Sequence, residues 1–435
     1  MLDQALSMNT SPRIVDYAIL GGGAAGFFSG IRLAELVPHA SIVILESSSN
    51  VLQKVRVSGG GRCNITHNCF EVSKLVQNYP RGERELKSVF SRFQPKDMLK
   101  WLEDHGVPTK IEDDGRIFPI SDSSESVIRC FMKETERLGV KVFLNHLVQA
   151  VKYNDESLVF EIEFSKDEKL ICRHLLLATG SSKTGRRLAE SFGHSIVTPV
   201  PSLFSFNVKD SRIAELPGLS FRNVKIEMKF EDKKFKSEGP ALITHWGWSG
   251  PAILKLSAFA ARELAASEYR SSFKINFSPD KSETDLRKDV AYRREHYPTR
   301  GLKNDRLVPL PSRYWLKVLE ACEIDDRCSW GQVSKAAIEK LLKEILRAEF
   351  EMEARTTYKE EFVTAGGVDR REVNFQTMQS KIIPGLYFAG EILDIDAVTG
   401  GFNFQNCWSG AWVAAESVAD DLRSKRAEPV SCVNI

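Results

Sequence analysis

A short glycine-rich run near the start of the chain has the spacing of a phosphate-binding turn. Residues 21–26 read GGGAAG and match the pattern G-x-G-x-x-G. The first glycine permits a tight turn, the second lets the backbone approach a diphosphate, and the third lets a helix pack closely on a strand. The first N–H groups of that helix would stabilise the phosphate charge. The residues that we expect to bind a dinucleotide here are Gly21, Gly23, Ala24, Ala25 and Gly26.

An acidic residue ends the next apolar segment. Glu46 lies 20 residues after Gly26, and its carboxylate can accept hydrogen bonds from an adenosine ribose. An acid at this place also disfavours a 2′-phosphate. The alternative is a glycine turn in an ordinary strand–helix–strand unit.

The segment after Glu46 combines glycines with cations and amides. Residues 58–64 read SGGGRCN, and the three glycines remove side chains where the chain could pass against a flat ligand. Lys54 and Arg62 would supply positive charge for phosphates, and Ser58 and Asn64 would supply hydrogen bonds. The alternative is a flexible surface loop. The candidate cofactor contacts are Lys54, Ser58, Gly59, Gly60, Arg62, Cys63 and Asn64.

Three later segments place small or polar residues after apolar runs. Residues 175–180 read LLLATG, residues 390–396 read GEILDID, and residues 399–405 read TGGFNFQ. The last of these opens a helix whose N–H groups could face the O2 edge of a flavin and stabilise charge on the reduced ring. Taken singly, each segment could be an ordinary turn between a strand and a helix. The candidate contacts are Ala178, Thr179, Gly180, Gly390, Gly401, Phe402 and Asn403.

The elements that must position these residues follow an α/β pattern. We expect a strand at 13–20, a helix at 24–36 and a strand at 41–46, which make a βαβ unit with a parallel sheet. A helix at 127–138 and strands at 140–144 and 170–178 continue the pattern. From about residue 199, alternating segments such as 224–230 are typical of antiparallel strands with one solvated face. A linker at 278–284 and a proline-broken helical stretch at 285–346 follow, before a final helix at 405–422.

This order predicts an α/β protein with a discontinuous Rossmann-like domain. We assign residues 13–198 and 364–425 to that domain, residues 199–278 and 345–363 to an inserted β-rich domain, and residues 279–344 to an inserted helical domain. A second G-x-G-x-x-G opening a helix is missing from the middle of the sequence. NAD(P)H, as a transient electron donor, would therefore dock over the exposed ring of a bound flavin and not in a separate nicotinamide-binding domain.

Composition excludes several classes of protein. The 435 residues carry 60 Lys+Arg and 58 Asp+Glu, a formal net charge of +2, which argues against a large basic nucleic-acid face. No apolar run approaches the roughly 20 residues of a membrane helix, and residues 1–12 lack the apolar core of a signal peptide. The eight cysteines form no disulfide framework, and we expect a cytoplasmic protein with no metal site.

Several residues have both a chemical and a structural interpretation. His245 precedes a helix start at Pro251, and it is either a proton donor near the flavin or a buried, hydrogen-bonded histidine at a domain hinge. Cys63 and Cys69 have C-x5-C spacing, which in a helical stretch places the thiols about 120° apart and disfavours a disulfide. The basic residues between Arg287 and Arg306 are interpreted as a solvated helical face. The more specific alternative is an RNA-binding patch.

These motifs together resemble the two-dinucleotide-fold FAD flavoproteins, and more closely the YhiN/BaiN-like family (aminoacetone oxidase family FAD-binding enzymes). The resemblance covers about residues 14–425 and depends on the runs above together with THWGWSGPAIL (244–254), VTAGGV (363–368) and TMQSK (377–381). It implies that the Rossmann-like domain binds FAD and that the inserted β-rich domain is β-barrel-like, with a helical domain inserted in turn. It also implies redox chemistry, with Glu391 near the ribityl chain and the backbone of Val148 near the adenine. Ala397, where a glycine is usual, and the short 181–187 loop depart from the family pattern.

We therefore expect a cytoplasmic FAD-dependent oxidoreductase that acts on a small molecule, either an amine or an enone-like compound. The flavin would carry the hydride. Two alternatives remain open, an FAD-dependent tRNA-modifying enzyme and a non-catalytic flavin-binding regulatory protein. We do not expect a membrane or nucleic-acid partner under the first hypothesis.

Overall fold

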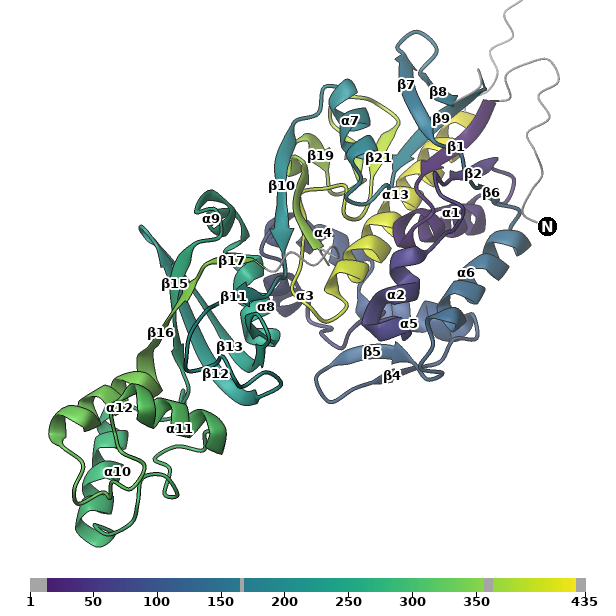
Figure 1. Cartoon of the computed structure of the whole chain (residues 1–435). Coiled ribbons are helices and arrows are strands. Elements are labelled where there is room, and N and C mark those ends of the chain that lie inside the picture. Colours follow the sequence, from purple (N-terminus) through teal and green to yellow (C-terminus); the bar gives the residue numbers. More distant parts are fainter. Residues whose placement is uncertain (1–13, 165–167, 356–362, 428–435) are drawn as a thin grey trace, which may run out of the picture. The chain divides into compact units, whose positions relative to one another are not determined.

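The computed structural model describes residues 14–164, 168–355 and 363–427 (Figure 1). The expectations for residues 1–12, for Arg13, for 356–362 of the barrel-like segment and for Cys432 lie outside these ranges. The chain divides into two compact units, residues 1–199 with 366–435 and residues 200–365. Within the described ranges, no helix has the length and apolar character needed to cross a membrane.

The first unit is built on a mixed sheet with a parallel centre. The parallel strands follow the order β21–β9–β1–β2–β6, so β1 lies between β9 and β2. The apolar run at β1 is buried on both faces, as expected for a strand inside a parallel sheet. The strands of this sheet are β1 (Ile14–Leu20), β2 (Ile42–Leu45), β6 (Lys141–Phe143), β7 (Val148–Asn154), β8 (Val159–Phe164), β9 (Lys169–Leu177), β19 (Val373–Asn374), β20 (Gln379–Ser380) and β21 (Leu386–Phe388).

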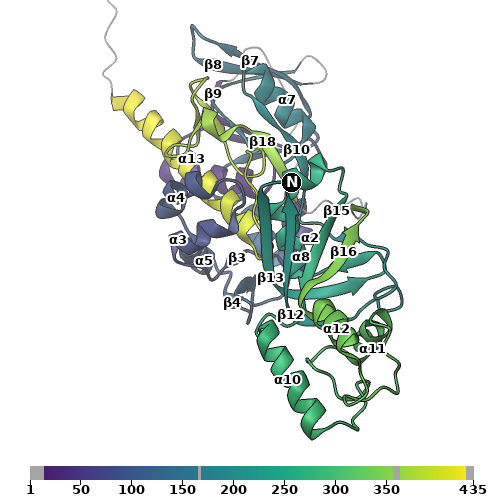
Figure 2. The same ribbon diagram turned by 90° about the vertical axis from the view of Figure 1, so that its left-hand side faces the viewer.

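Two helices from opposite ends of the sequence pack together against this sheet. The helix α1 (Ala24–Leu36) contacts the long final helix α13 (Phe402–Ala427), which runs beside α4 (Glu83–Arg92) in both views (Figures 1 and 2). The Arg32 guanidinium lies over the Trp412 ring at 3.5 Å and pairs with Glu416. The first and last parts of the chain thus form one Rossmann-like α/β unit, and the predicted fold class is confirmed.

Smaller elements complete the first unit around these two helices. The helices are α2 (Gln53–Gly61), α3 (Val72–Leu75), η1 (Val76–Asn78), α5 (Pro95–Asp104), α6 (Ser124–Arg137), α7 (Lys183–Ser191) and η2 (Arg370–Glu372). A three-stranded sheet contains β3 (Thr66–His67), β5 (Arg116–Pro119) and β4 (Thr109–Ile111). The strands β10 (Ile196–Ser202) and β18 (Val363–Val368) pair with each other where the chain leaves and re-enters the unit.

The second unit contains a seven-stranded sheet whose neighbours are antiparallel. In β12, Val224, Ile226 and Met228 are buried while Lys225 and Lys229 are exposed, the alternation predicted for this segment. The sheet order is β16–β15–β12–β13–β14–β11–β17. Its strands are β11 (Phe206–Asn207), β12 (Ser220–Phe230), β13 (Lys233–Thr244), β14 (Gly247–Ser249), β15 (Ser271–Asn276), β16 (Ala348–Met352) and β17 (Ala354–Arg355).

Helices share one hydrophobic core with this sheet. The helix α8 (Pro251–Phe259) begins after Gly250 with proline in its first turn, as predicted, and its neighbour is α9 (Ala261–Ala266). The helices α10 (Glu283–His296), α11 (Ser312–Ala321) and α12 (Lys335–Arg347) gather together in Figure 1. One buried cluster extends from Phe206 and Trp248 of the sheet to Trp315 and Leu341 of these helices.

Three boundaries differ from the expectations. The helix α6 starts at Ser124, three residues early, because Ser123 accepts a hydrogen bond from the Glu125 N–H and caps it. The final helix starts at Phe402 rather than 405. The segment from Cys63 to Cys69 contains a strand, β3, and Cys63 has φ +63°, so the helical spacing argument about these thiols was wrong.

Candidate functional site

A cavity of about 430 Å³ lies in the first unit, and its walls follow directly after parallel strands. Residues 21–25 follow β1, Glu46 follows β2, residues 178–182 follow β9, and residues 389–391 follow β21. Because the carboxyl ends of parallel strands meet at one edge of a sheet, residues far apart in the sequence converge here. The start of α2 and the first turns of α13 complete the wall.

The glycine run forms a cradle beside the start of α1. Gly21 has φ +111°, and a Cβ there would lie 2.5 Å from the Ala178 carbonyl oxygen. A Cβ on Gly26 would lie 2.0 Å from the Gly21 carbonyl oxygen, so Gly26 lies against the turn and not in the cavity wall. A Cβ on Gly23 would meet no described atom within 4 Å. The space above Gly23 and the first N–H groups of α1 is therefore open to a ligand.

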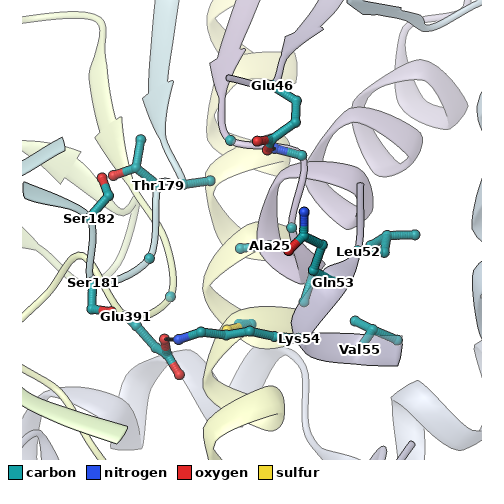
Figure 3. Close-up of a pocket in the computed structure, with 18 of the residues that line it drawn as sticks. Ala25, Glu46, Leu52, Gln53, Lys54, Val55, Thr179, Ser181, Ser182 and Glu391 are labelled. Carbon is teal, nitrogen blue, oxygen red and sulfur yellow. Dashed lines mark hydrogen bonds and ion pairs between the residues drawn. The ribbon is translucent and has the colours of Figure 1, made fainter. Parts of the chain in front are cut away.

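Glu46 faces this turn from the top of the cavity in Figure 3. Its Oε2 accepts a hydrogen bond from the Gly22 N–H at 2.8 Å, and its Oε1 accepts one from the Ser48 N–H at 2.9 Å. The Oε1 also accepts from the Ser47 hydroxyl at 3.3 Å, whereas the Oε2 has a further lone pair and can accept a hydroxyl. The position and the acceptor capacity both suit a ribose.

The wall after β9 carries an unsatisfied polar atom. The Oγ1 of Thr179 is buried and has no hydrogen-bond partner among the described residues, although Thr179 lines the cavity. Ser181 and Ser182 line the same wall, and the Ser182 Oγ caps α7 by accepting from the Gly185 N–H at 2.9 Å. A Cβ on Gly185 would lie 1.8 Å from this Oγ1, so the hydroxyl is buried against the start of α7 and does not face the cavity.

Lys54 and Glu391 form an ion pair inside the lining (Figure 3). Burial lowers the pKa of the Lys54 ammonium, the Glu391 carboxylate raises it, and the net shift is upward. The Cys407 thiol lies in the same lining, and burial raises its pKa to about 12. The lysine is thus charged and the thiol neutral near pH 7.

Half of the predicted contacts lie in this cavity. They are Gly21, Gly23, Ala24, Ala25, Glu46, Lys54, Ala178, Thr179, Gly180, Gly390 and Glu391. The others are outside its lining: Gly26, Ser58, Gly59, Gly60, Arg62, Cys63, Asn64, Val148, Gly401, Phe402 and Asn403.

The SGGGRCN segment is held by protein contacts. The Arg62 Nη1 donates to the Glu112 Oε1 at 2.6 Å, and the guanidinium lies 4.0 Å from the centre of the Phe118 ring. Cys63 is fully buried, and burial raises the pKa of its thiol to about 12. Asn64, with its amide oriented to satisfy its partners, accepts from the Gly401 N–H at 3.0 Å.

The start of α13 is fixed in a similar way. Gly401 has φ +90°, and a Cβ there would lie 2.6 Å from the Thr66 carbonyl oxygen. The Asn403 side chain accepts from the Ala397 N–H at 2.9 Å and donates to the Ala397 carbonyl at 3.2 Å. The Phe402 ring stacks on His67 with centroids 4.7 Å apart.

Val148 and His245 lie away from the cavity lining. Val148 is buried in β7 and pairs with Phe164 of β8. His245 lies in the second unit, in the turn between β13 and β14, and is exposed, so the alternative of a buried histidine was wrong. Trp248 is fully buried in the core, whereas Trp246 is exposed.

The basic residues of the second unit have acidic partners. Arg287 pairs with Glu283 and Glu339, and Lys303 pairs with Asp326 at 2.8 Å. These pairs are typical of the solvated helical face that the sequence predicted.

Sequence reasoning missed a second group of lining residues. They are Gly22, Ser48, Asn50, Leu52, Gln53, Val55, Ser181, Ser182, Ala389, Phe404 and Cys407. For Ser181 and Ser182, their place immediately after LLLATG was a usable signal. Cys407 lies on the helix α13, and nothing in its own neighbourhood in the sequence links it to the glycine run.

A family model described as the HI0933-like protein Rossmann domain matches residues 15–417. The chain belongs to this family. The predicted kinship with YhiN/BaiN-like proteins and the prediction of an FAD-dependent oxidoreductase are confirmed.

Curated relatives of two kinds match nearly the whole chain. The chain is 28% identical over 411 residues to the ribosomal RNA dihydrouridine synthase of Escherichia coli (strain K12), covering 93% of this chain and 98% of that protein. It is 26% identical over 407 residues to the 3-dehydro-bile acid delta(4,6)-reductase of Clostridium scindens, covering 92% and 98%.

A solved structure shares the fold. The 3-ketosteroid-delta4-(5alpha)-dehydrogenase of Rhodococcus jostii RHA1 aligns with a TM-score of 0.50 and 13% identity, covering 95% of this chain and 99% of that one. At this identity the likeness shows the fold alone.

The cavity fits the adenosine diphosphate part of FAD. It has an open glycine cradle at a helix start and an acid with free acceptor capacity. These features match the phosphates and the ribose of such a cofactor in kind.

Proposed function

We propose that this protein is an FAD-dependent reductase that adds a hydride and a proton across a carbon–carbon double bond conjugated to a carbonyl. Both kinds of curated relative are named for such a change, one forming dihydrouridine and the other removing double bonds of a 3-dehydro bile acid. FAD, when bound and reduced, supplies the hydride. The observation that carries the proposal is the cradle above Gly23, because it lies with Glu46 at the carboxyl edge of the sheet.

The chain's own residues would hold the cofactor along this edge. We assign the diphosphate to the N–H groups of Gly23, Ala24 and Ala25, and the adenosine ribose to Glu46. The N–H groups at the start of α13, held in place by Asn403 and Asn64, would face the flavin ring.

The test is anaerobic reoxidation. The purified flavoprotein is reduced by light and mixed with a cyclic enone, with uridine or with buffer alone, while the flavin's visible absorbance is followed. We expect the enone to restore the oxidised spectrum and to yield the saturated ketone. A flavin that no conjugated double bond reoxidises, but that a primary amine reduces in its oxidised form, would contradict the proposal in favour of an amine oxidase.

A uracil ring within ribosomal RNA is the second candidate substrate. Two curated relatives carry that name, from Escherichia coli and from Haemophilus influenzae (27% identity over 413 residues), so the expectation of no nucleic-acid partner lacks support. Reoxidation of the reduced flavin by ribosomal RNA, but not by free uridine, would favour this substrate. Its rate should fall steeply with salt, because RNA contacts release counterions.

NAD(P)H remains the proposed electron donor, and His245 the proposed proton donor. If NAD(P)H is the donor, anaerobic addition of NADPH or NADH bleaches the flavin. The variant His245→Gln should keep its flavin and reduce the enone more slowly, and an unchanged rate would remove His245 from the mechanism.

A further inference from the structure

An ion pair crosses the cavity at the end away from Glu46. Lys54 is the second residue of α2, and Glu391 follows the turn after β21, so the contact joins two walls that are 337 residues apart in the sequence. Figure 3 shows Glu46 at the top of the cavity and the Lys54–Glu391 contact at the bottom. Both side chains line the cavity.

A dinucleotide with its adenosine at Glu46 would extend towards this contact. Gly23 of the cradle belongs to the same lining, as do Phe404 and Cys407 of α13. With the flavin towards the start of α13, the diphosphate–ribityl segment would pass the Lys54–Glu391 contact. We infer that the Lys54–Glu391 pair is a strap that opens to admit FAD, closes across this segment and slows its release. The inference depends on the FAD site proposed above.

The two side chains differ in the way that a strap requires. Glu391 is 12% exposed and lies in the wall, whereas Lys54 is 58% exposed at the end of a four-carbon stem. We therefore expect the Lys54 side chain to move when the strap opens, because its ammonium can leave the Glu391 carboxylate and be rehydrated at little cost. A closed strap also places a cation between Glu391 and the diphosphate, where the carboxylate alone would repel the phosphates.

The floor beneath the pair is small and uncharged. A Cβ on Gly390 would lie 3.0 Å from the Cys407 Sγ and 3.5 Å from the Ala25 Cβ, so these residues are in close contact. The high pKa of the Cys407 thiol keeps it neutral. Among the lining residues, Lys54 has the only cationic side chain, and Glu391 and Glu46 have the only carboxylates.

The experiment measures FAD release from the holoenzyme by the rise in flavin fluorescence after dilution. We expect Lys54→Met and Glu391→Gln each to speed release about 3- to 10-fold, the range of one partly exposed ion pair. The double variant should release FAD no faster than the faster single variant, because either change alone opens the strap. Lys54→Arg should keep release slow. Higher salt should speed release from the wild type and leave Lys54→Met unchanged.

Two controls separate a strap from a general effect. Arg56→Met alters another exposed cation of α2, which pairs with Glu125 outside the lining, and should leave release unchanged. AMP fills only the Glu46 end, so its affinity should be equal in wild type and Lys54→Met. Wild-type release rates in Lys54→Met would overturn the inference, as would equal weakening of AMP and FAD. This experiment measures FAD release and not catalysis. Failure of the enone test would therefore leave the inference about the strap unaffected.

Discussion

Two glycine-rich segments of the first unit lie in contrasting surroundings. Around residues 21–26 the protein leaves space in a cavity wall, since a Cβ on Gly23 would meet no described atom within 4 Å. Around residues 58–64 and 401–403 polar side chains have protein partners, because Arg62 pairs with Glu112 and Asn403 bonds to the Ala397 backbone. Similar residue types thus line a cavity in one segment and stabilise the fold in the other.

The contrast shows how a glycine can be assigned to binding or to packing. At Gly401 a Cβ would strike the Thr66 backbone, so this glycine is required by the protein itself. At Gly23 the missing side chain leaves space in the cavity wall. The distinction predicts that a substitution at Gly23 lowers FAD affinity, whereas a substitution at Gly401 lowers the free energy of unfolding.

Gly23→Val should give the largest effect on the cofactor. Its side chain would fill the cradle, and we expect FAD affinity to fall ~100-fold or more, equivalent to about 2.7 kcal/mol. The melting temperature of the apo-protein should stay within error of the wild type, because the backbone at Gly23 has φ −94° and suits any residue. FAD titration and thermal unfolding check both parts, and full flavin occupancy would show that the cradle is misassigned.

Gly401→Ala should show the opposite pattern. Positive φ and a contact with the Thr66 backbone should lower the free energy of unfolding by about 2–4 kcal/mol. The matched control is Gly60→Ala, which has φ +70° but open space for a Cβ, and should cost about 1 kcal/mol. Chemical denaturation of the apo-proteins measures both. Equal costs would mean that the Thr66 contact relaxes freely.

Arg62→Met should have the smallest effect on binding. The guanidinium pairs with Glu112 and packs on Phe118, so we expect FAD affinity within about 2-fold of the wild type and a stability loss of about 0.5–1 kcal/mol. A large loss of affinity would instead move Arg62 into the cofactor site, as the sequence alone predicted.

The sequence predicted the strand–helix–strand core well because its signals are local. The helix over 24–36, the flanking strands and the acid after the second strand all follow from apolar runs and glycine spacing within a short segment. The seven-stranded sheet was foreseeable only in part, from alternation in segments such as Ser220–Phe230.

What the sequence could not supply is which distant residues become neighbours. Lys54 meets Glu391 because β21 lies beside β9, and β9 beside β1, an order that no local pattern encodes. The same holds for Arg62, whose cation suits a phosphate but whose partner, Glu112, is brought near it by the three-stranded sheet of β3, β4 and β5. The identity of a polar residue was predictable, and its partner was not.

Hydrogen–deuterium exchange of the apo-protein with and without FAD tests the location of the cofactor most directly. The account predicts slower exchange on FAD binding in four segments that contribute to the cavity wall, at residues 21–25, 46–55, 178–182 and 389–391. Protection confined to other segments, with these four unchanged, would contradict the assignment of the cavity to FAD.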